Sequence, residues 1–213
     1  MEIKQIMKVA TILLLTISMG FTESVKNKPF KSGDLLFRGR MQGSLSQAID
    51  AVTQTAKEHH FTHMGIVEVL NDTVWVYHAA PEKGVCKELL ADFSLNEEDS
   101  VVLGHFRIKE SNSEMINRAL GIAKQYVGQP YNYTYIMKDE GFYCSEYVYQ
   151  LFKQDSIFKL NPMTFIDPSS GEYHSAWIEH YHDLGIDIPE GLPGCNPNGM
   201  AANERLDFLG LVE

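Results

Sequence analysis

The feature that most constrains the fold is a pair of β-rich segments joined by a two-residue turn. His63 to Leu70 (HMGIVEVL) and Thr73 to Ala79 (TVWVYHA) are rich in β-branched and aromatic residues, and Asn71-Asp72 between them is a turn signal. This pattern predicts an antiparallel β-hairpin. Shorter or similar apolar runs predict three more strands, at Asp34–Phe37, Val101–Ile108 and Asp207–Val212.

Helical patterns surround the hairpin. Ser44–His59 is a predicted helix because Leu45, Ile49 and Val52 recur at helical spacing. Two further helices are expected at Ser111–Val127, where Ser111 and Glu114 have capping-box spacing, and at Phe142–Phe152. From Asn161 onward Pro and Gly are frequent and regular periodicity is scarce. Strands followed by helices and a loop-rich end predict a single α+β domain.

Composition limits the class of protein further. The chain has 213 residues, of which 44% are hydrophobic, and this suffices for one domain with its own core. The formal net charge of −10 argues against a nucleic-acid partner, because phosphate contacts need a surplus of Lys and Arg. It slightly favours cationic or neutral substrates over anionic polymers.

Residues 1–25 are predicted to be a signal peptide. Lys4 and Lys8 precede an apolar run over Val9–Phe21, and this order is typical of a secretory signal. The run is too short for a membrane-spanning helix, which needs about 20 residues. A buried N-terminal helix is the alternative. We therefore expect an exported bacterial protein, periplasmic or secreted, with no stable membrane anchor after signal removal and with one domain over residues 26–213.

The chain has three cysteines, an odd number, so in an exported protein at least one thiol is free or pairs between chains. Cys144 follows the chain-breaking Gly141 and opens a predicted helix, whose N-terminus lowers the pKa of a thiol and offers N–H groups to an oxyanion. Cys144 is therefore the candidate nucleophile, with a small core thiol as the alternative. Cys86 and Cys195 lack such surroundings, and either pair with each other or both stay reduced.

A thiol nucleophile needs a base, usually His. His63 opens a predicted strand beside Gly65, where another backbone or a substrate can approach closely, and His78 lies near the end of the paired strand. The hairpin would bring the two together, so that His78 orients His63 as the third member of a triad orients the base. The alternative for each is a structural histidine. The remaining histidines are expected to be solvated or structural, and no spacing matches a metal-binding motif, although a zinc site is conceivable among His174, His180 and His182 with their acidic neighbours.

Several blocks of the sequence resemble a known family. They are Gly33-Asp-Leu-Leu-Phe37, Phe61-Thr-His-Met-Gly-Ile-Val67, Gly128-Gln-Pro-Tyr-Asn132 and Tyr143-Cys-Ser-Glu-Tyr-Val148. In order and spacing they resemble the permuted papain-like amidases of the YiiX/YaeF type. These belong with the NlpC-like cysteine hydrolases and are similar in arrangement to lecithin retinol acyltransferase. The resemblance covers roughly residues 32–155.

The resemblance implies a permuted papain-like (NlpC-like) fold, with a small antiparallel sheet or half-barrel packed against helices. It implies Cys144 as nucleophile and His63 as general base. His78 takes the third polar position, where many members carry Glu. Tyr143 is a candidate for the substrate or oxyanion pocket, and Asp34 is expected to hold backbone near the site.

The function expected from these residues is an exported cysteine hydrolase that cleaves amide bonds through a Cys-His-His acyl-enzyme mechanism, on cell-wall peptides or N-acylated small molecules. A thiol-dependent acyltransferase or thioesterase on lipid substrates is the first alternative, and a non-catalytic binding module is the second. No metal or organic cofactor is expected. The partner is a small-molecule, peptide or lipid amide substrate, and the oligomeric state stays open.

Overall fold

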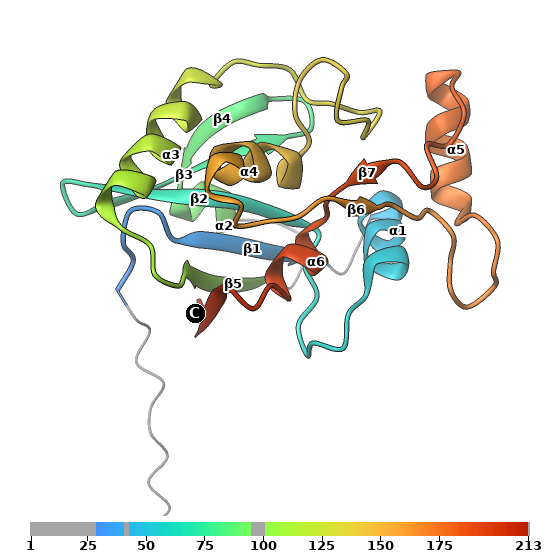
Figure 1. The fold of residues 1–213 in the computed structure, drawn as a ribbon. Coiled ribbons are helices and arrows are strands. Elements are labelled where there is room, and N and C mark those ends of the chain that lie inside the picture. The colour runs from blue at the N-terminus through green and yellow to red at the C-terminus, as the bar shows by residue number, and fades with distance from the viewer. Residues whose placement is uncertain (1–28, 41–42, 95–100, 213) are drawn as a thin grey trace, which may run out of the picture.

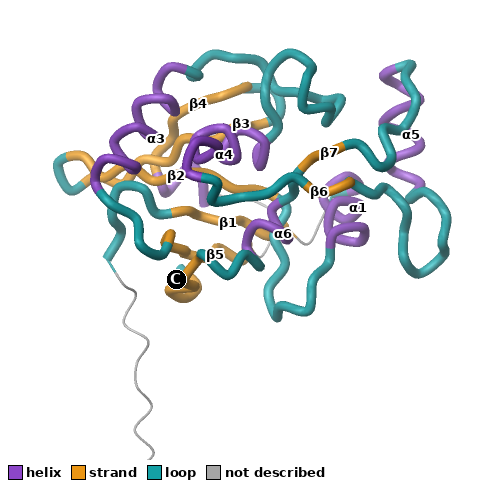
Figure 2. Tube along the Cα trace, viewed as in Figure 1, coloured by secondary structure: helices purple, strands orange, loops and turns teal. Residues whose placement is uncertain are grey.

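The computed structural model describes residues 29–40, 43–94 and 101–212. Its centre is a six-stranded antiparallel sheet with the strand order β4-β3-β2-β1-β5-β8 (Figures 1 and 2). The strands are β1 (Leu35–Arg40), β2 (His63–Leu70), β3 (Thr73–Ala80), β4 (Gly84–Leu89), β5 (Val101–Ile108) and β8 (Leu206–Leu211). The α+β class predicted from the sequence is confirmed.

The predicted hairpin is present and consists of β2 and β3. Val67 pairs with Val76 and Leu70 pairs with Thr73. Asn71 and Asp72 have φ values of 48° and 60°, and positive φ at both central residues is the requirement of a type I′ turn. This turn matches the twist of the flanking strands, and the hairpin therefore follows directly from the local sequence.

Helices cover both faces of the sheet. On one face lie α3 (Ser113–Gln125) and α4 (Cys144–Phe152), and on the other lies the short α2 (Leu90–Ser94) (Figure 1). Leu35 and Phe37 face the larger core beneath α3 and α4, whereas Leu36 between them joins Phe93 of α2. Alternation along β1 thus supplies both cores, which explains why its sequence is continuously apolar.

A second group of elements lies beside one end of the sheet. It contains α1 (Ser44–Thr53), α5 (Ser175–Leu184), α6 (Pro197–Ala201) and the two-stranded ribbon of β6 (Asn161–Pro162) and β7 (Pro193–Gly194) (Figure 1). α1 packs against α5, and both α1 and α4 contact α6. The C-terminal region is therefore tied to α4.

The structure corrects several expected boundaries. The helix predicted to run to His59 ends at Thr53. Asn112, not Ser111, caps α3, because its side chain accepts a hydrogen bond from the backbone N–H of Met115. β4, α2, α5 and α6 were not predicted, since each is short or lacks clear periodicity. The predicted signal peptide lies outside the described residues.

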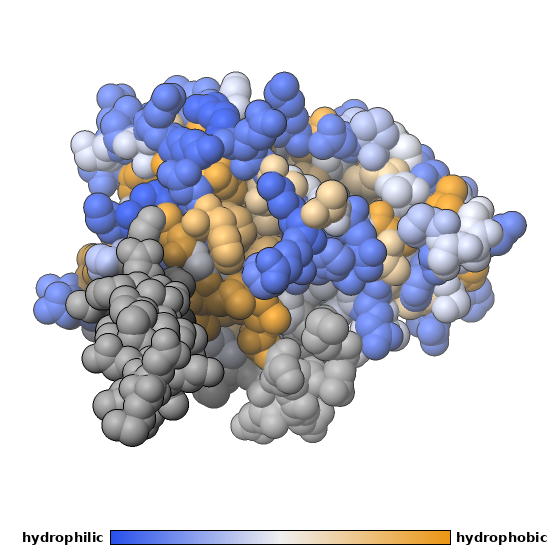
Figure 3. Space-filling model, turned by 90° about the horizontal axis from the view of Figure 1, so that it is seen from below, coloured by the Kyte–Doolittle hydropathy of each residue, from blue (hydrophilic) through white to orange (hydrophobic). Residues whose placement is uncertain are grey.

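The face seen in Figure 3 carries hydrophobic side chains gathered near its centre. Phe208 and Leu211, on the edge strand β8, are among the exposed large apolar residues of the protein. Within the described ranges, no helix combines the length and apolarity that crossing a membrane requires.

Candidate active site

α4 begins where the connection from α3 folds back and its two ends are joined by hydrogen bonds. Gly141 has a φ of 87°, and a Cβ atom there would collide with the carbonyl oxygen of Pro130. The backbone N–H of Phe142 donates to that same oxygen (3.1 Å), and the N–H of Asn132 donates to the carbonyl of Phe142 (3.2 Å). Glycine is required at position 141 for this close approach. The loop ending at Asn132 thereby positions the residues that open α4.

A buried carboxylate fixes the first turn of α4. Glu146 Oε2 accepts hydrogen bonds from the backbone N–H of Tyr143 (3.3 Å) and from Asn132 Nδ2 (3.2 Å). Burial raises the pKa of Glu146 to about 7, although these hydrogen bonds act in the opposite direction. Asn132 and Glu146 were not predicted as site residues. Glu146 is the N3 residue of α4, and a glutamate at that capping position is the signal that could have found it, whereas Asn132 carries no such local signal.

Cys144 is the first residue of α4 and is buried. Its Sγ lies 4.0 Å from the carbonyl oxygen of Thr62, and the backbone N–H groups of Ser145 and Met64 stabilise its thiolate form. The thiol therefore faces the backbone on both sides of His63. Burial outweighs these N–H groups and raises the pKa of Cys144 to about 11. The lowered pKa expected at a helix N-terminus is wrong in direction, because desolvation is the larger effect.

His63 and His78 lie together, as the hairpin predicted. Both side chains are buried, and His63 Nε2 and His78 Nδ1 are 2.8 Å apart. Gly65 makes this approach possible, since a Cβ atom there would lie 2.7 Å from Val76 Cγ1 and 3.1 Å from His78 Cβ. The structure therefore brings Cys144, His63 and His78 into one region at the start of β2.

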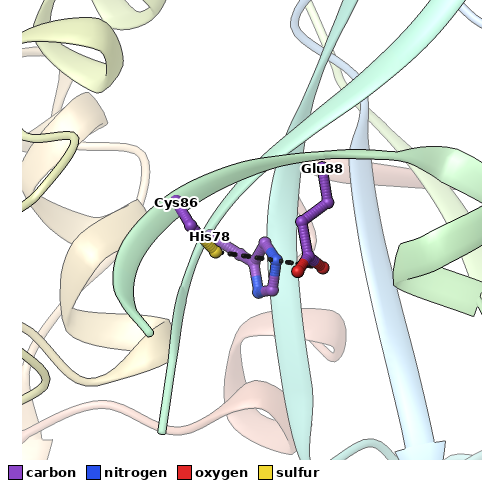
Figure 4. Close-up of side chains that lie close together, drawn as sticks. All are labelled: His78, Cys86 and Glu88. Carbon is purple, nitrogen blue, oxygen red and sulfur yellow. Dashed lines mark hydrogen bonds and ion pairs between the residues drawn. The ribbon is translucent and has the colours of Figure 1, made fainter. Parts of the chain in front are cut away.

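The hydrogen-bonded chain continues onto β4 (Figure 4). His78 Nε2 lies 3.0 Å from Glu88 Oε2 and 3.4 Å from Cys86 Sγ. The hydrogen bond from His78, helped by Lys83, holds the pKa of Glu88 down at about 2 despite partial burial. Burial lowers the pKa of His78, and Glu88 opposes this shift. Sequence reasoning missed Glu88, because its place depends on the β3–β4 pairing and β4 was not predicted.

An apolar cavity of about 110 Å³ opens beside Cys144. Its wall combines side chains of α1, the loop of residues 131–135, α4 and α5, including Ile49, Val52, Tyr131, Tyr135, Tyr143, Phe165 and Trp177. The hydroxyl of Tyr143 accepts a hydrogen bond from the backbone N–H of Cys195 (3.2 Å) and lies 3.2 Å from Met137 Sδ. The ring of Tyr143 is thus part of the wall, and its hydroxyl anchors the Cys195 loop.

Comparisons with known proteins show the family of the chain. The family described as "Permuted papain-like amidase enzyme, YaeF/YiiX, C92 family" matches residues 29–210. The chain belongs to this family. It is accordingly a cysteine hydrolase. A solved structure similar to this permuted papain-like amidase is that of yiiX from Escherichia coli O157:H7, which its description calls a metalloprotein.

The two structures share a fold. Their TM-score is 0.69 at 20% sequence identity, over 85% of this chain and 97% of the other. A search of the curated proteins finds no match. The expected permuted papain-like fold is therefore confirmed for this C92-family chain.

Asp34 of this permuted papain-like amidase is a buried anchor beneath β1. Arg107 Nε donates to Asp34 Oδ1 (2.6 Å), and His105 Nε2 lies 2.7 Å from Oδ2. Burial alone would raise the pKa of Asp34, but the hydrogen bonds from Arg107 and His105 outweigh it and lower the pKa. His105 is thus bonded within the sheet.

The histidines of the C-terminal region do not gather into a metal site among the described residues. His174 caps α5, His180 bonds the carbonyl of Tyr133, and His182 pairs with Asp183. The zinc site considered there has no support in the structure. The three cysteines of the amidase are all free thiols, so Cys86 and Cys195 are not bonded to each other.

Proposed function

We propose that this amidase hydrolyses amide bonds through an acyl-enzyme on Cys144, with His63 as the base and His78 as its orienting residue. The observation that carries the proposal is the continuous hydrogen-bonded chain from His63 through His78 to Glu88. Glu88 lies 3.0 Å from His78, so a carboxylate lies behind the base, beyond His78.

The carboxylate of Glu88 fixes which nitrogens of His78 and His63 donate hydrogen bonds and which accept them. Ionised Glu88 can only accept a hydrogen bond, so neutral His78 carries its proton on Nε2 and presents Nδ1 as an acceptor. His63 then donates through Nε2, since its Nε2 is 2.8 Å from that acceptor. The remaining nitrogen of His63, Nδ1, keeps a lone pair. This tautomer is the one that can take a proton from Cys144.

The neutral thiol reacts by transferring its proton in the same step as it attacks. Cys144 Sγ bonds to the substrate carbonyl carbon while its proton passes to His63 Nδ1, and the oxygen becomes an oxyanion. Backbone N–H groups at the start of α4 stabilise that oxyanion. Collapse breaks the C–N bond, and His63 returns the proton to the leaving amine. Water, deprotonated by His63, then releases the acyl group.

The cavity beside Cys144 indicates the substrate class. An apolar cavity of about 110 Å³ fits a short apolar side chain or acyl group next to the scissile carbonyl. A net charge of −10 favours neutral or cationic substrates. A peptide amide or an N-acylated small molecule meets both conditions. Export through the predicted signal peptide would place such an enzyme among cell-wall peptides.

One observation favours a second candidate, an acyltransferase or thioesterase that acts on lipid substrates. Tyr131 and Tyr135 both line the apolar cavity, as a lipid-binding site would require. Tyr133 does not line it and is partly exposed. Supplying amide and lipid ester substrates in parallel separates the two functions: release of free acid from amides alone supports the amidase, and acyl transfer from lipid alone supports the alternative.

The nucleophile is tested by labelling the protein with a thiol-reactive acylating probe. We expect one label on Cys144, lost in Cys144→Ala and retained in Cys195→Ala, which removes the other buried thiol of the same cavity. Loss of amide hydrolysis must accompany the loss of label. Labelling that persists undiminished in folded Cys144→Ala contradicts the assignment. Absence of any hydrolysis in the wild type would instead favour the non-catalytic binding module.

A further inference from the structure

The β3–β4 hairpin gathers three metal-binding side chains behind the candidate active site (Figure 4). His78 and Cys86 are directly opposite each other in the strand pairing, and Glu88 lies two residues farther along β4, on the same face as Cys86. They offer an imidazole nitrogen, a sulfur and a carboxylate oxygen, all within 4.8 Å of one another. Among the described residues this is the one such group of three or more.

The spacing of these donors fits a tetrahedral zinc ion. Zinc bonds to nitrogen and oxygen are about 2.0–2.2 Å long and bonds to sulfur about 2.3 Å, so tetrahedral donors are separated by roughly 3.4 Å (N to O) and 3.5 Å (N to S). The observed separations are 3.0 Å from His78 Nε2 to Glu88 Oε2 and 3.4 Å from His78 Nε2 to Cys86 Sγ. Shifts of a few tenths of an ångström would therefore admit the ion. A thiolate and a carboxylate balance its two positive charges.

The group can be reached from solvent. The His78 side chain is 2% exposed and Glu88 15% exposed, whereas Lys83, which pairs with Glu88 Oε1, is 64% exposed. An ion can therefore enter beside Lys83 and bind Glu88 Oε2, with the fourth coordination position open to water.

We propose that His78, Cys86 and Glu88 bind one zinc ion and that this ion switches off hydrolysis by reversing the hydrogen bond between His78 and His63. The inhibition rests on the proposed function, whereas the binding of the ion does not. Both the binding and the inhibition depend on His78 Nε2, which donates a hydrogen bond to Glu88 without the ion and binds the ion when it is present.

The reversal follows from proton positions. Zinc takes the Nε2 lone pair of His78, so the neutral ring carries its proton on Nδ1 and donates to His63 Nε2. His63 must then hold its own proton on Nδ1, where it can no longer accept one from Cys144. The two rings keep the same number of protons. The thiol proton of Cys86 is released to solvent, and nothing is oxidised or reduced.

Binding is measured on metal-free folded protein by equilibrium dialysis with Zn²⁺ and by the thiolate-to-metal absorption band of bound Co²⁺. We expect one ion per chain in the wild type, in Cys144→Ser and in the matched control Cys195→Ser. Cys86→Ser should lose the Co²⁺ thiolate band and at least about 100-fold in zinc affinity, since even changes outside the ligand sphere cost 10–100-fold. No binding by the wild type, or a band lost only in Cys144→Ser, overturns the proposed site.

Inhibition is measured on the wild type and on Cys86→Ser, which removes a metal ligand but no member of the hydrolytic chain. One equivalent of Zn²⁺ should abolish wild-type hydrolysis, a chelator should restore it, and Cys86→Ser should stay active in both conditions. Stoichiometric binding through Cys86 without loss of activity overturns the switch while leaving the site standing. If the wild type hydrolyses no amide, the proposed function has failed, and the binding measurements still decide the site.

Discussion

Replacing Glu88 by Gln tests the role of the negative charge while keeping the hydrogen-bond geometry. Gln has nearly the same shape and keeps an oxygen that can accept a hydrogen bond from His78 Nε2, which lies 3.0 Å from the carboxylate in the wild type. Only the negative charge is lost. If that charge stabilises the imidazolium of His63 during the reaction, the rate must fall although the protein folds normally.

The magnitude follows from the distances. The ring centroids of His63 and His78 are 5.0 Å apart and Glu88 Oε2 is 3.0 Å from His78 Nε2, so the carboxylate lies roughly 8 Å from the His63 charge. At an effective dielectric constant of about 20, two unit charges at that separation interact by about 2 kcal/mol. We therefore expect kcat to fall about 30-fold. KM should stay unchanged, because the interaction is made only after the proton has moved.

The assay follows release of a chromogenic amine from a short N-acyl amide, with a chelator present throughout so that no metal occupies His78. The pH dependence of kcat/KM gives a second readout. Because Glu88 favours protonated imidazole, its removal should move the acid limb of the profile to lower pH. Glu68→Gln is the matched control, since Glu68 is also a buried carboxylate of the sheet but accepts from Tyr77 and pairs with Lys124.

The control should retain activity within about threefold, the range of ordinary surface and packing effects on a distant site. An unchanged kcat in folded Glu88→Gln would refute the idea that the carboxylate acts through His78. Equal losses in both variants would also refute it, because they would trace the effect to the sheet as a whole.

Three further variants test other parts of the site. Gly65→Ala should lower kcat at least tenfold while the circular dichroism spectrum stays native, because its Cβ would lie 2.7 Å from Val76 Cγ1 and push β3 away from His63. Glu146, with its pKa raised to about 7, is protonated in the folded state while the unfolded chain ionises near 4.5, so stability falls as pH rises between these values. Glu146→Gln should remove that fall. In urea unfolding of the wild type, we expect the free energy of unfolding to be lower at pH 8 than at pH 5 by at most about 3 kcal/mol. Asp34→Asn should lower Tm by about 10 °C, since breaking a buried pair costs about 3 kcal/mol.

The fold could be predicted from the sequence where local pattern alone decides the structure. β2 and β5 have the predicted bounds, because their apolar runs end at turn residues or at a change of polarity. β4 was not predicted, because Gly84 to Leu89 mixes charged and apolar residues without clear alternation. Its place in the sheet is decided by pairing with β3, and that pairing cannot be deduced from the sequence of one strand alone.

The site residues also differ in whether the local sequence could reveal them. Cys144, His63 and His78 could be nominated because each stands at a recognisable position, a helix start or a strand of a predicted hairpin. Glu88 and Cys86 could not, since their proximity to His78 depends on the register of β4. The pKa of Cys144 was predicted in the wrong direction because a helix N-terminus is visible in sequence whereas the depth of burial is not.

The chain through Glu88 also gives a physical reason why His can stand at position 78, where the resemblance to this family implies Glu in many members. A carboxylate at that position would touch His63 directly and interact with its charge by about 4 kcal/mol at roughly 4 Å, against about 2 kcal/mol from Glu88. In the proposed mechanism, the hydrogen-bonded chain through His78 therefore preserves the tautomer of His63 and halves the charge stabilisation. In return it leaves a second ring nitrogen beside Cys86, 3.4 Å away, which a carboxylate bonded to His63 would not provide. Under the two proposals, weaker stabilisation of the imidazolium and sensitivity to a metal ion both follow from the same residue at position 78.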